Sequence, residues 1–506
     1  MKFKIVLGWA LLLTVTVNAQ SPDAKKYGSQ VTANQLKEYL NIIASDALEG
    51  RETGTRGQKM AAAFIAAHFQ ELGFKAPVNG SYYQPVELFS SSPGEVYLKI
   101  GQTKLDNYAG VVYTGSGDSG GEVSLPVVFA GYGTEADFNQ VDVKDKAVVL
   151  LAKDTRASRN PAVKMARDKG AKLIILNANE TLAEFDNWAT QVKDYFSGGN
   201  FELTKPDASK MPAPAMLISP VTLEKIFNKK LEDLKKISAA DPKKGALKKL
   251  KAANVQYKVS SVVKTTYSEN VLGYMEGTDK KDELVVITAH YDHIGKRKSG
   301  EGDLINNGAD DDGSGTVSVM TIAKAFAQAK KEGKGPRRSI LFMTVTGEEK
   351  GLLGSEYYSE HPVYPLASTV VDLNIDMVGR RDPQHKEGDY IYVIGSDKLS
   401  ADLHSLSERV NKENLNVAFD YTYNDQNHPE RLYYRSDHWN FAKKNVPIIF
   451  YFDGIHEDYH RPSDEVSKIE FDLMEKRAQT VFYTAWEIAN RDQRLKVDEE
   501  KKIQQE

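Results

Sequence analysis

Apolar and polar residues follow a repeating pattern in the second half of the chain. From residue 284 onward, mainly apolar runs alternate with segments whose apolar residues repeat at helical spacing. The runs span residues 284–289, 340–346, 370–375, 390–394 and 446–452. Strands that are apolar along their whole length are typical of a mainly parallel sheet covered by helices on both faces. The pattern therefore predicts an α/β domain.

The first half of the chain has a different texture. Apolar residues at helical spacing predict helices near residues 36–43 and 60–72, whereas residues 98–259 contain short β-like runs separated by turns. We interpret residues 98–260 as an inserted, β-rich domain that divides the α/β domain into residues 20–97 and 261–490. A final helix is expected at 471–489, and the charged tail 491–506 is expected to be frayed or disordered.

The N-terminal residues have the features of a secretory signal peptide. Lys2 and Lys4 precede an almost entirely apolar stretch at residues 5–17, and cleavage is expected after Ala19. The stretch is shorter than the ~20 residues that span a bilayer, which disfavours the alternative of an uncleaved anchor. We therefore expect export to the periplasm or the exterior, without stable membrane insertion.

Composition narrows the possible chemistry. The chain has 506 residues, 66 Lys and Arg against 70 Asp and Glu, a net charge of −4 and no cysteine. Without cysteine, disulfides, thiolate nucleophiles and Cys-ligated metals are excluded, so any metal must be bound by histidines and carboxylates. The balanced charge gives no reason to expect nucleic acid as a partner.

Possible metal ligands follow the ends of the predicted strands. In chain order these are His290, the Asp310–Asp312 triplet, Glu348 and Glu349, Asp376, and His460. Carboxyl ends of parallel strands meet at one edge of the sheet, so these residues are expected to lie together. Two adjacent divalent ions need a bridging carboxylate and terminal histidine and carboxylate ligands. The mixture favours zinc, with cobalt or manganese as possible substitutes.

These motifs, with the opening Leu48-Glu49-Gly50-Arg51-Glu52-Thr53-Gly54-Thr55, resemble the secreted co-catalytic di-zinc aminopeptidase family. The resemblance covers roughly residues 30–95 and 265–490. The insertion resembles a protease-associated domain through Val128-Phe129-Ala130-Gly131-Tyr132-Gly133. The resemblance implies a zinc-exopeptidase fold, two zinc ions, peptide substrates and hydrolysis at a free N-terminus, and it leaves the oligomeric state open.

The resemblance also implies a role for each residue. Asp311 would bridge the ions, His290 and Asp376 would complete one zinc site, and Glu349 and His460 the other. Glu348 would be the catalytic base. The Asp292 carboxylate would accept the second imidazole N–H of His290. The Asp311–Asp312 peptide bond is expected to be cis. Tyr433 and Ser436 would line the substrate pocket.

Several alternatives stay open on the residues alone. His456-Glu457-Asp458-Tyr459-His460 spells the H-E-x-x-H motif of zincins, but Gly454 and Pro462 argue against the helix it requires. A carboxypeptidase or dipeptidase on the same scaffold would need a cation for the substrate carboxylate, for which Arg380, Arg381 and Arg435 are candidates. A single-zinc glutaminyl cyclase and a non-catalytic binding protein are further alternatives, disfavoured because the full ligand set is present.

Overall fold

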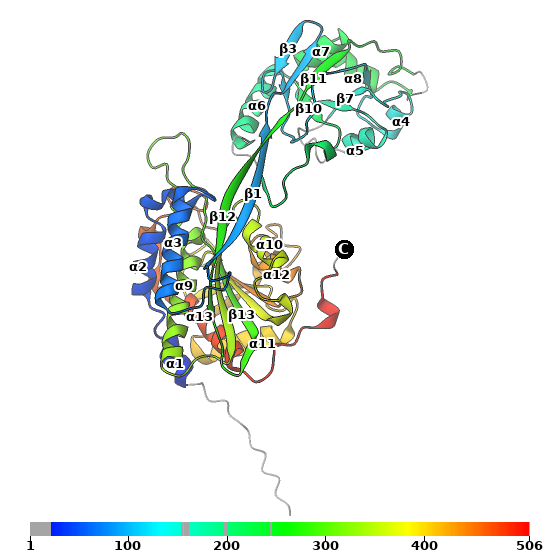
Figure 1. Cartoon of the computed structure of the whole chain (residues 1–506). Coiled ribbons are helices and arrows are strands. Elements are labelled where there is room, and N and C mark those ends of the chain that lie inside the picture. The colour runs from blue at the N-terminus through cyan, green and yellow to red at the C-terminus, as the bar shows by residue number, and fades with distance from the viewer. Residues whose placement is uncertain (1–21, 153–154, 156–160, 197–199, 243–244, 505–506) are drawn as a thin grey trace, which may run out of the picture. The chain divides into compact units, whose positions relative to one another are not determined.

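The chain divides into two compact units. The computed structural model describes residues 22–152, 155, 161–196, 200–242 and 245–504. Unit 1 contains the chain up to Val86 and from Ser268 onward, and unit 2 contains Glu87–Tyr267. Strands β1 (Tyr83–Pro93) and β12 (Ser261–Met275) carry the chain from one unit into the other (Figure 1).

Unit 1 is built on a mixed sheet. In the described part of the chain the strand order is β17-β16-β18-β15-β13-β14-β12-β1-β9. The strands of unit 1 introduced here are β13 (Lys280–His290), β14 (Arg338–Val345), β15 (Thr369–Ile375), β16 (Tyr390–Ile394), β17 (Ala418–Asp420) and β18 (Ile448–Phe452). Strand β9 (Asn200–Glu202) belongs to unit 2, where it pairs with residues 89–91 of β1. The central pairs β13–β14, β13–β15 and β15–β18 are parallel, while β12 and β16 pair antiparallel with their neighbours β14 and β18.

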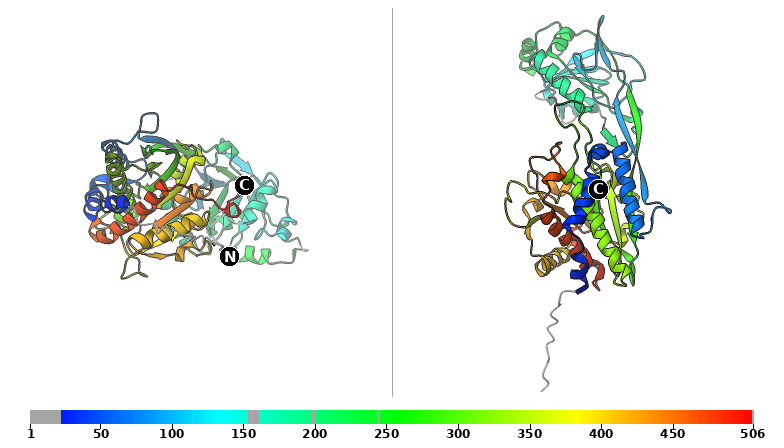
Figure 2. Two further views of the ribbon diagram at one scale, coloured as in Figure 1. Left: turned by 90° about the horizontal axis from the view of Figure 1, so that it is seen from below. Right: turned by 90° about the vertical axis from the view of Figure 1, so that its left-hand side faces the viewer.

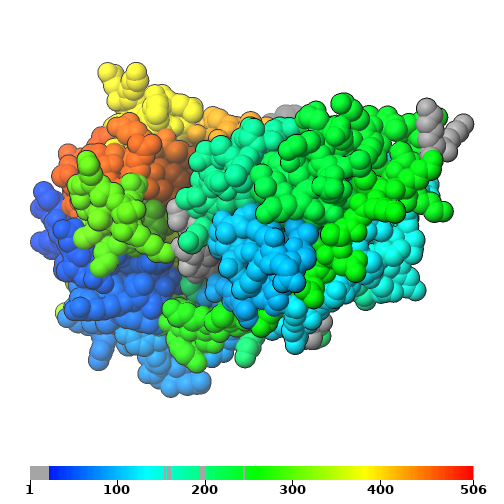
Figure 3. Space-filling view, turned by 90° about the horizontal axis from the view of Figure 1, so that it is seen from above, coloured from blue at the N-terminus to red at the C-terminus, as the bar shows by residue number. Residues whose placement is uncertain are grey.

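Helices cover both faces of this sheet (Figures 1 and 2). One face packs against α1 (Pro22–Gly28), α2 (Ala33–Ile43), α3 (Arg56–Glu71), α9 (Gly315–Lys331), α11 (Ala401–Asn414) and α13 (Phe471–Asn490). The other packs against α10 (Leu353–Glu360) and α12 (His438–Ala442). In the space-filling view, early segments of this unit (blue) lie beside late ones (orange), in agreement with the contact between α2 and residues 466–468 (Figure 3).

The apolar run of β13 shows why the strands are apolar throughout. Val285 and Ile287 belong to the core under α9 and α13, whereas Leu284 and Val286 belong to the core under α10 and α12. Successive strand residues point to opposite faces, so a strand covered on both sides needs apolar side chains at every position. The predicted α/β architecture is confirmed.

Unit 2 has two sheets of its own and several helices. Its strands are β2 (Tyr97–Ile100), β3 (Thr103–Asp106), β4 (Val111–Val112), β5 (Val123–Leu125), β6 (Val127–Phe129), β7 (Ala147–Leu151), β8 (Leu173–Asn177), β10 (Ala215–Ile218) and β11 (Val255–Lys258). Its helices are α4 (Glu135–Phe138), α5 (Pro161–Asp168), α6 (Leu182–Phe196), α7 (Pro220–Phe227) and α8 (Leu231–Ser238). The order β4-β10-β8-β7-β6 forms one sheet and β3-β2-β11-β5 the other. The unit is therefore mixed α/β rather than simply β-rich.

The limits of this unit differ from those expected. The sequence places them at residues 98 and 260, whereas the compact unit runs from Glu87 to Tyr267. The difference arises because β1 and β12 cross the division as continuous strands. No turn or change in composition therefore marks the division in the sequence.

The expectation of a frayed tail is wrong for residues 491–504. Leu495 is buried, the backbone N–H of Ala401 donates to the Asp498 carboxylate at 2.9 Å, and Ile503 N–H donates to Asn445 Oδ1 at 2.7 Å. These contacts hold the segment against unit 1 although most of its residues are charged or polar.

Two expectations concern the membrane and export. No described helix combines the length and apolar character needed to cross a membrane. The predicted signal peptide, residues 1–19, lies outside the described residues.

Candidate active site

The parallel strands bring the predicted ligands to one edge of the sheet. His290 is the last residue of β13, Glu348 and Glu349 follow β14, and Asp376 follows β15 directly. Asp311 precedes α9, and His460 lies in the loop after β18. Because β13 pairs in parallel with both β14 and β15, and β15 with β18, these loops meet at the carboxyl edge.

Asp311 lies between two sets of possible ligands. Its Oδ1 is 3.2 Å from His290 Nε2, which is itself 3.5 Å from Asp376 Oδ1. Its Oδ2 is 3.1 Å from His460 Nε2, which is 3.2 Å from Glu349 Oε2. One carboxylate therefore presents one oxygen to each set, as a bridging ligand does.

The donor set fits divalent zinc. Two histidines and three carboxylates supply the nitrogen and oxygen donors that zinc accepts. Asp311 Oδ2 and Glu349 Oε1 are buried and make no hydrogen bond within the described structure, which suits atoms that ligate a cation. Burial raises the pKa of Glu349, as does Asp311, but contacts with His293 and His460 outweigh both effects and hold it at about 2. The carboxylate is therefore ionised, as ligation requires.

The pKa of His460 is raised by the carboxylates around it. Burial alone lowers the pKa of this imidazole, but the carboxylates of Asp311 and Glu349 outweigh burial and raise it to about 10. In the absence of a cation, His460 is therefore held as an imidazolium by the two carboxylates, and a metal ion would replace its proton.

The three aspartates of the triplet have different partners. Asp312 accepts hydrogen bonds from the backbone N–H groups of His290, Gly315 and Met377 at 3.2, 2.8 and 3.1 Å. Asp310 accepts from Gly379 N–H at 2.7 Å. Asp311 alone of the three faces both histidines, and the Asp311–Asp312 peptide is cis, as expected from the resemblance.

Two residues that the sequence reasoning missed hold these loops in place. The Asp464 carboxylate accepts the backbone N–H groups of Asp310 and Asp311 at about 3.0–3.1 Å. The buried Arg51 guanidinium donates to four backbone carbonyls, those of Ile43, Tyr291, Asn307 and Gly308. The signal for Arg51 is its place in the opening segment 48–55, and no sequence signal marks Asp464.

Glu348 lies beside the first ligand set. Its Oε2 is 3.9 Å from His290 Nε2, and it forms a group with His290 and Asp376 whose ligand atoms lie within 4.8 Å of one another. Burial, followed by the nearby carboxylates of Glu349 and Asp376, raises the pKa of Glu348 well above its usual value, although His290 opposes the rise. A carboxylate with a raised pKa accepts a proton readily, which is what a general base needs.

The expected role of Asp292 needs correction. His290 Nδ1 lies 3.0 Å from the backbone carbonyl of Asp292 and 3.9 Å from its carboxylate. The carboxylate instead accepts from Thr53 Oγ1 at 2.6 Å and from Glu348 N–H at 3.3 Å. Asp292 therefore orients the imidazole through its main chain, because the side chain points towards the loop that carries Glu348.

The two predicted pocket residues also lie elsewhere. Ser436 Oγ donates to Asp376 Oδ2 at 2.6 Å and accepts from Asn374 Nδ2 at 2.9 Å, so it positions a ligand instead of lining the pocket. Tyr433 is buried and its carbonyl lies 2.9 Å from His438 Nε2.

A cavity of about 30 Å³ adjoins the ligands. His290, Asp311, Glu348 and Asp376 form its polar wall, and the remaining lining residues are Met377, Leu432, Arg435, Phe450, Phe452, Ile455 and Tyr459. Tyr459 lines this cavity and Tyr433 does not. Burial and then the carboxylates of Asp311, Glu349 and Glu348 raise the pKa of Tyr459, so its hydroxyl keeps its proton.

The H-E-x-x-H stretch is not helical. Residues 456–460 form turns, and His456 Nε2 lies 3.2 Å from Asp310 Oδ2 while its Nδ1 accepts from Asp458 N–H. The zincin geometry needs both histidines on one helical face. His456 therefore supports the loop through Asp310, and only His460 reaches the ligand group.

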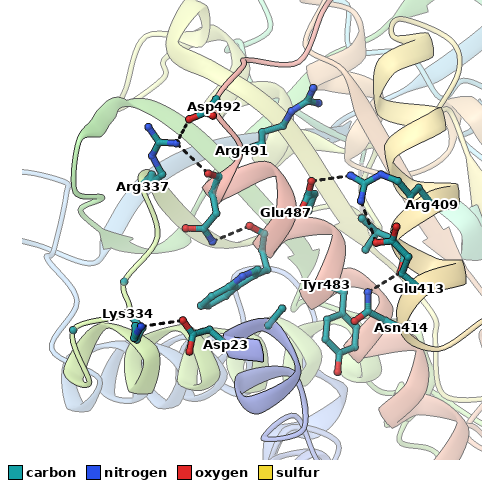
Figure 4. Close-up of a pocket in the computed structure, with 16 residues that line it drawn as sticks. Asp23, Lys334, Arg337, Arg409, Glu413, Asn414, Tyr483, Glu487, Arg491 and Asp492 are labelled. Carbon is teal, nitrogen blue, oxygen red and sulfur yellow. Dashed lines mark hydrogen bonds and ion pairs between the residues drawn. The ribbon is translucent and has the colours of Figure 1, made fainter. Parts of the chain in front are cut away.

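A larger hollow of about 610 Å³ is lined by residues far along the chain from these ligands (Figure 4). Its four lining cations are all paired: Lys334 with Asp23 at 3.2 Å, Arg409 with Glu487 at 2.7 Å, Arg491 with Asp402 at 3.0 Å, and Arg337 with Asp279 and Asp492. Since its cations already have carboxylate partners, the charge pattern of this hollow does not indicate a ligand.

Comparison with known proteins agrees with the geometry. Residues 270–485 match the sequence model of a protein family that is described as "Peptidase family M28". A probable leucine aminopeptidase of Trichophyton verrucosum is 29% identical over 216 residues, which cover 42% of this chain and 55% of that protein. A probable glutamate carboxypeptidase of Arthroderma benhamiae is 35% identical over 129 residues, covering 25% of this chain and 16% of the other. The chain thus spans only about half, or less, of the length of these curated relatives.

Solved structures share the fold. An aminopeptidase from Aneurinibacillus sp. strain AM-1 superposes with a TM-score of 0.55 at 21% identity, over 94% of this chain and 98% of that one. A zinc aminopeptidase from Bacillus subtilis superposes with a TM-score of 0.50 at 19% identity, over 91% and 96%. The family match over residues 270–485 and the ligand groups at the carboxyl edge thus show that this part of the chain is similar to peptidase family M28.

Proposed function

We propose that the protein is a zinc-dependent aminopeptidase that removes N-terminal residues from peptides. The observation that carries the proposal is the position of Asp311, whose two oxygens lie about 3 Å from two different histidines. Each histidine has a further carboxylate beside it, Asp376 for His290 and Glu349 for His460. His290, Asp311 and Asp376 would bind one zinc ion, and Asp311, Glu349 and His460 the second, with cobalt or manganese as possible substitutes.

Bound zinc would supply Lewis acidity, polarising the substrate carbonyl and lowering the pKa of a water molecule. Glu348 takes the proton of the attacking water and transfers it to the departing amine, a role supported by its raised pKa and its place on the cavity wall. The Tyr459 hydroxyl, which lines the same cavity, donates a hydrogen bond to the developing oxyanion. Ser436 fixes the orientation of Asp376.

Charge at the cavity favours an amine over a carboxylate at the substrate end. Three carboxylates line the cavity; Asp311 and Asp376 are proposed zinc ligands, which leaves Glu348 as the carboxylate that attracts an ammonium group. Of the three arginines considered for a carboxypeptidase, Arg380 pairs with Asp458 at 2.9 Å and Arg381 with Glu470 at 2.8 Å. The remaining one, Arg435, lines the cavity and lies 3.3 Å from Glu430. Arg435 and the glutamate carboxypeptidase relative support a carboxypeptidase or dipeptidase as the second candidate.

Product analysis separates the two candidates. One peptide is incubated with the zinc-loaded protein in three forms: unmodified, N-acetylated and C-amidated. We expect stepwise loss of N-terminal residues that acetylation and a chelator block and amidation does not. Loss from the C-terminus, blocked by amidation, would instead establish the carboxypeptidase, and no cleavage would contradict both.

Export and the identity of unit 2 are part of the proposal. The charged start and apolar stretch of residues 1–19 support cleavage after Ala19 and release into the periplasm or the exterior. The segment 128–133 supports a protease-associated domain. N-terminal sequencing of the protein recovered from cell fractions tests the first point, since an intact Met1 in the cytoplasm would contradict it.

A further inference from the structure

His293 is a buried histidine beside the second ligand set. It lies three residues after His290, and its backbone N–H donates to the Arg51 carbonyl at 3.1 Å. Its side chain is fully buried. The main chain and the surrounding packing therefore fix where the imidazole points.

The imidazole contacts two of the proposed ligands. His293 Nδ1 is 2.7 Å from Glu349 Oε1 and 3.8 Å from Asp311 Oδ2. Despite the first distance, no hydrogen bond of acceptable geometry joins the atoms: both His293 nitrogens, Glu349 Oε1 and Asp311 Oδ2 lack a hydrogen-bond partner within the described structure. Buried polar atoms normally have such partners, so four unpaired atoms in one place call for a common explanation.

Other buried histidines of this unit differ from His293. His68 Nε2 lies 2.9 Å from the Met320 carbonyl, and His438 Nε2 lies 2.9 Å from the Tyr433 carbonyl. Each of these imidazoles has a polar partner through one nitrogen at least. The polar atoms beside His293 Nδ1 belong to carboxylates that the proposed function assigns to zinc.

We propose that His293 is a fourth protein ligand of the second zinc ion, binding through Nδ1. The inference rests on the two-metal site of the proposed function. Ligand atoms bound at 2.0–2.2 Å to one ion cannot lie more than about 4.4 Å apart. The distances of 2.7 and 3.8 Å from Nδ1 to Glu349 and Asp311 satisfy this limit, and these three residues form one of the two ligand groups found in the described chain.

A fourth ligand makes the two ion sites unequal. With His293, Asp311, Glu349 and His460, the second ion has the four protein ligands typical of a closed, structural zinc site. The first ion, with His290, Asp311 and Asp376, keeps the open position typical of a catalytic site. Glu348 lies on that first side, 3.9 Å from His290 Nε2. Water activation would therefore be concentrated at the first ion.

X-ray absorption spectroscopy at the zinc edge tests the ligand directly. In wild-type protein loaded with two zinc ions we expect a total of three imidazole ligands for the two ions. In His293→Gln we expect a total of two. Titration against a competing chelator measures the affinity of each zinc-binding step. In the variant we expect the affinity of the weaker step to fall by more than the about 10–100-fold that is typical when a residue hydrogen-bonded to a ligand is removed. His68→Gln, which removes a buried histidine of the same unit, should change neither readout.

The outcomes separate the inference from the proposed function. Two bound ions with only two imidazoles in the wild type, unchanged by His293→Gln, would overturn the inference and leave the proposed function intact. A wild-type protein that binds no zinc would overturn both. If His293→Gln does not fold, a crystal structure of the zinc-bound wild type decides the question, because a ligating Nδ1 must lie about 2.1 Å from the ion.

Discussion

Both units contain parallel strands, yet only one has chemistry at the strand ends. In unit 2, β6, β7, β8 and β10 pair in parallel and are followed by Ala130, Ala152, Ala178 and Ser219. In unit 1, His290 ends β13, Asp376 follows β15 directly, and Glu348 and Glu349 come three and four residues after β14. Both ligand groups of the described residues include these side chains. The scaffold alone therefore does not determine function; the residues just beyond the strands do.

The largest effect on this contrast is expected from Asp311→Ala. Since Asp311 faces both histidines, its loss removes a ligand from each ion. We expect zinc content to fall from two ions per chain to about none, and peptidase activity to fall by more than about 10⁴-fold. Elemental analysis after gel filtration and an assay measure both, and retention of two tightly bound ions would refute the bridge.

Glu348→Gln separates metal binding from catalysis within the same unit. The amide cannot take up a proton, so kcat should fall by about 10²–10⁴-fold. Zinc content should stay unchanged, because all of the proposed ligands remain. Glu348→Asp, which keeps the carboxylate, serves as the matched variant and should retain part of the activity; near-wild-type turnover in zinc-loaded Glu348→Gln protein would rule out this base.

Ser436→Ala tests the positioning of a ligand. The variant loses the hydrogen bond of 2.6 Å to Asp376 Oδ2 and leaves the ligand itself in place. We expect zinc affinity at the first site to weaken by about 10–100-fold. A competitive chelator titration gives the affinity, and Ser436→Thr, which keeps the hydroxyl, should restore most of it. Equal affinities for all three proteins would contradict the positioning role.

The smallest effect on activity is expected at a strand end of unit 2. Asn177 Nδ2 donates to the Ile218 carbonyl at 3.1 Å between β8 and β10. Asn177→Ala leaves this buried carbonyl without that donor, so the free energy of unfolding of unit 2 should fall by about 1–3 kcal/mol. Peptidase activity below the melting temperature should change less than about twofold, and a large loss of kcat would show that unit 2 takes part in catalysis.

The sequence predicts best what depends on short local patterns. The run 390–394 coincides with β16, because a strand buried on both faces is mainly apolar. The run 370–375 coincides with β15 apart from its first residue, although Asp372 and Asn374 interrupt it. The ligands could be grouped because parallel strands end at a common edge. Their grouping did not require knowledge of side-chain directions.

Side-chain direction is what the sequence could not supply. The side chains of Ser436 and Asp292 bind neighbours that only the folded structure identifies, and Tyr433 is buried. His293, three residues after His290, received no role for the same reason. The packed tail depends on long-range contacts of Leu495 and Asp498, which no local pattern records.

The way the chain leaves and re-enters unit 1 has an evolutionary consequence. Leu272 N–H donates to the Tyr82 carbonyl at 2.8 Å, and Asn270 Nδ2 donates to Gln84 Oε1 at 3.0 Å, so the two points of passage are neighbours. A segment gained or lost between neighbouring strands lengthens or shortens a hairpin and leaves every ligand-bearing strand in register. Evolution could therefore exchange unit 2 without rebuilding the proposed metal site.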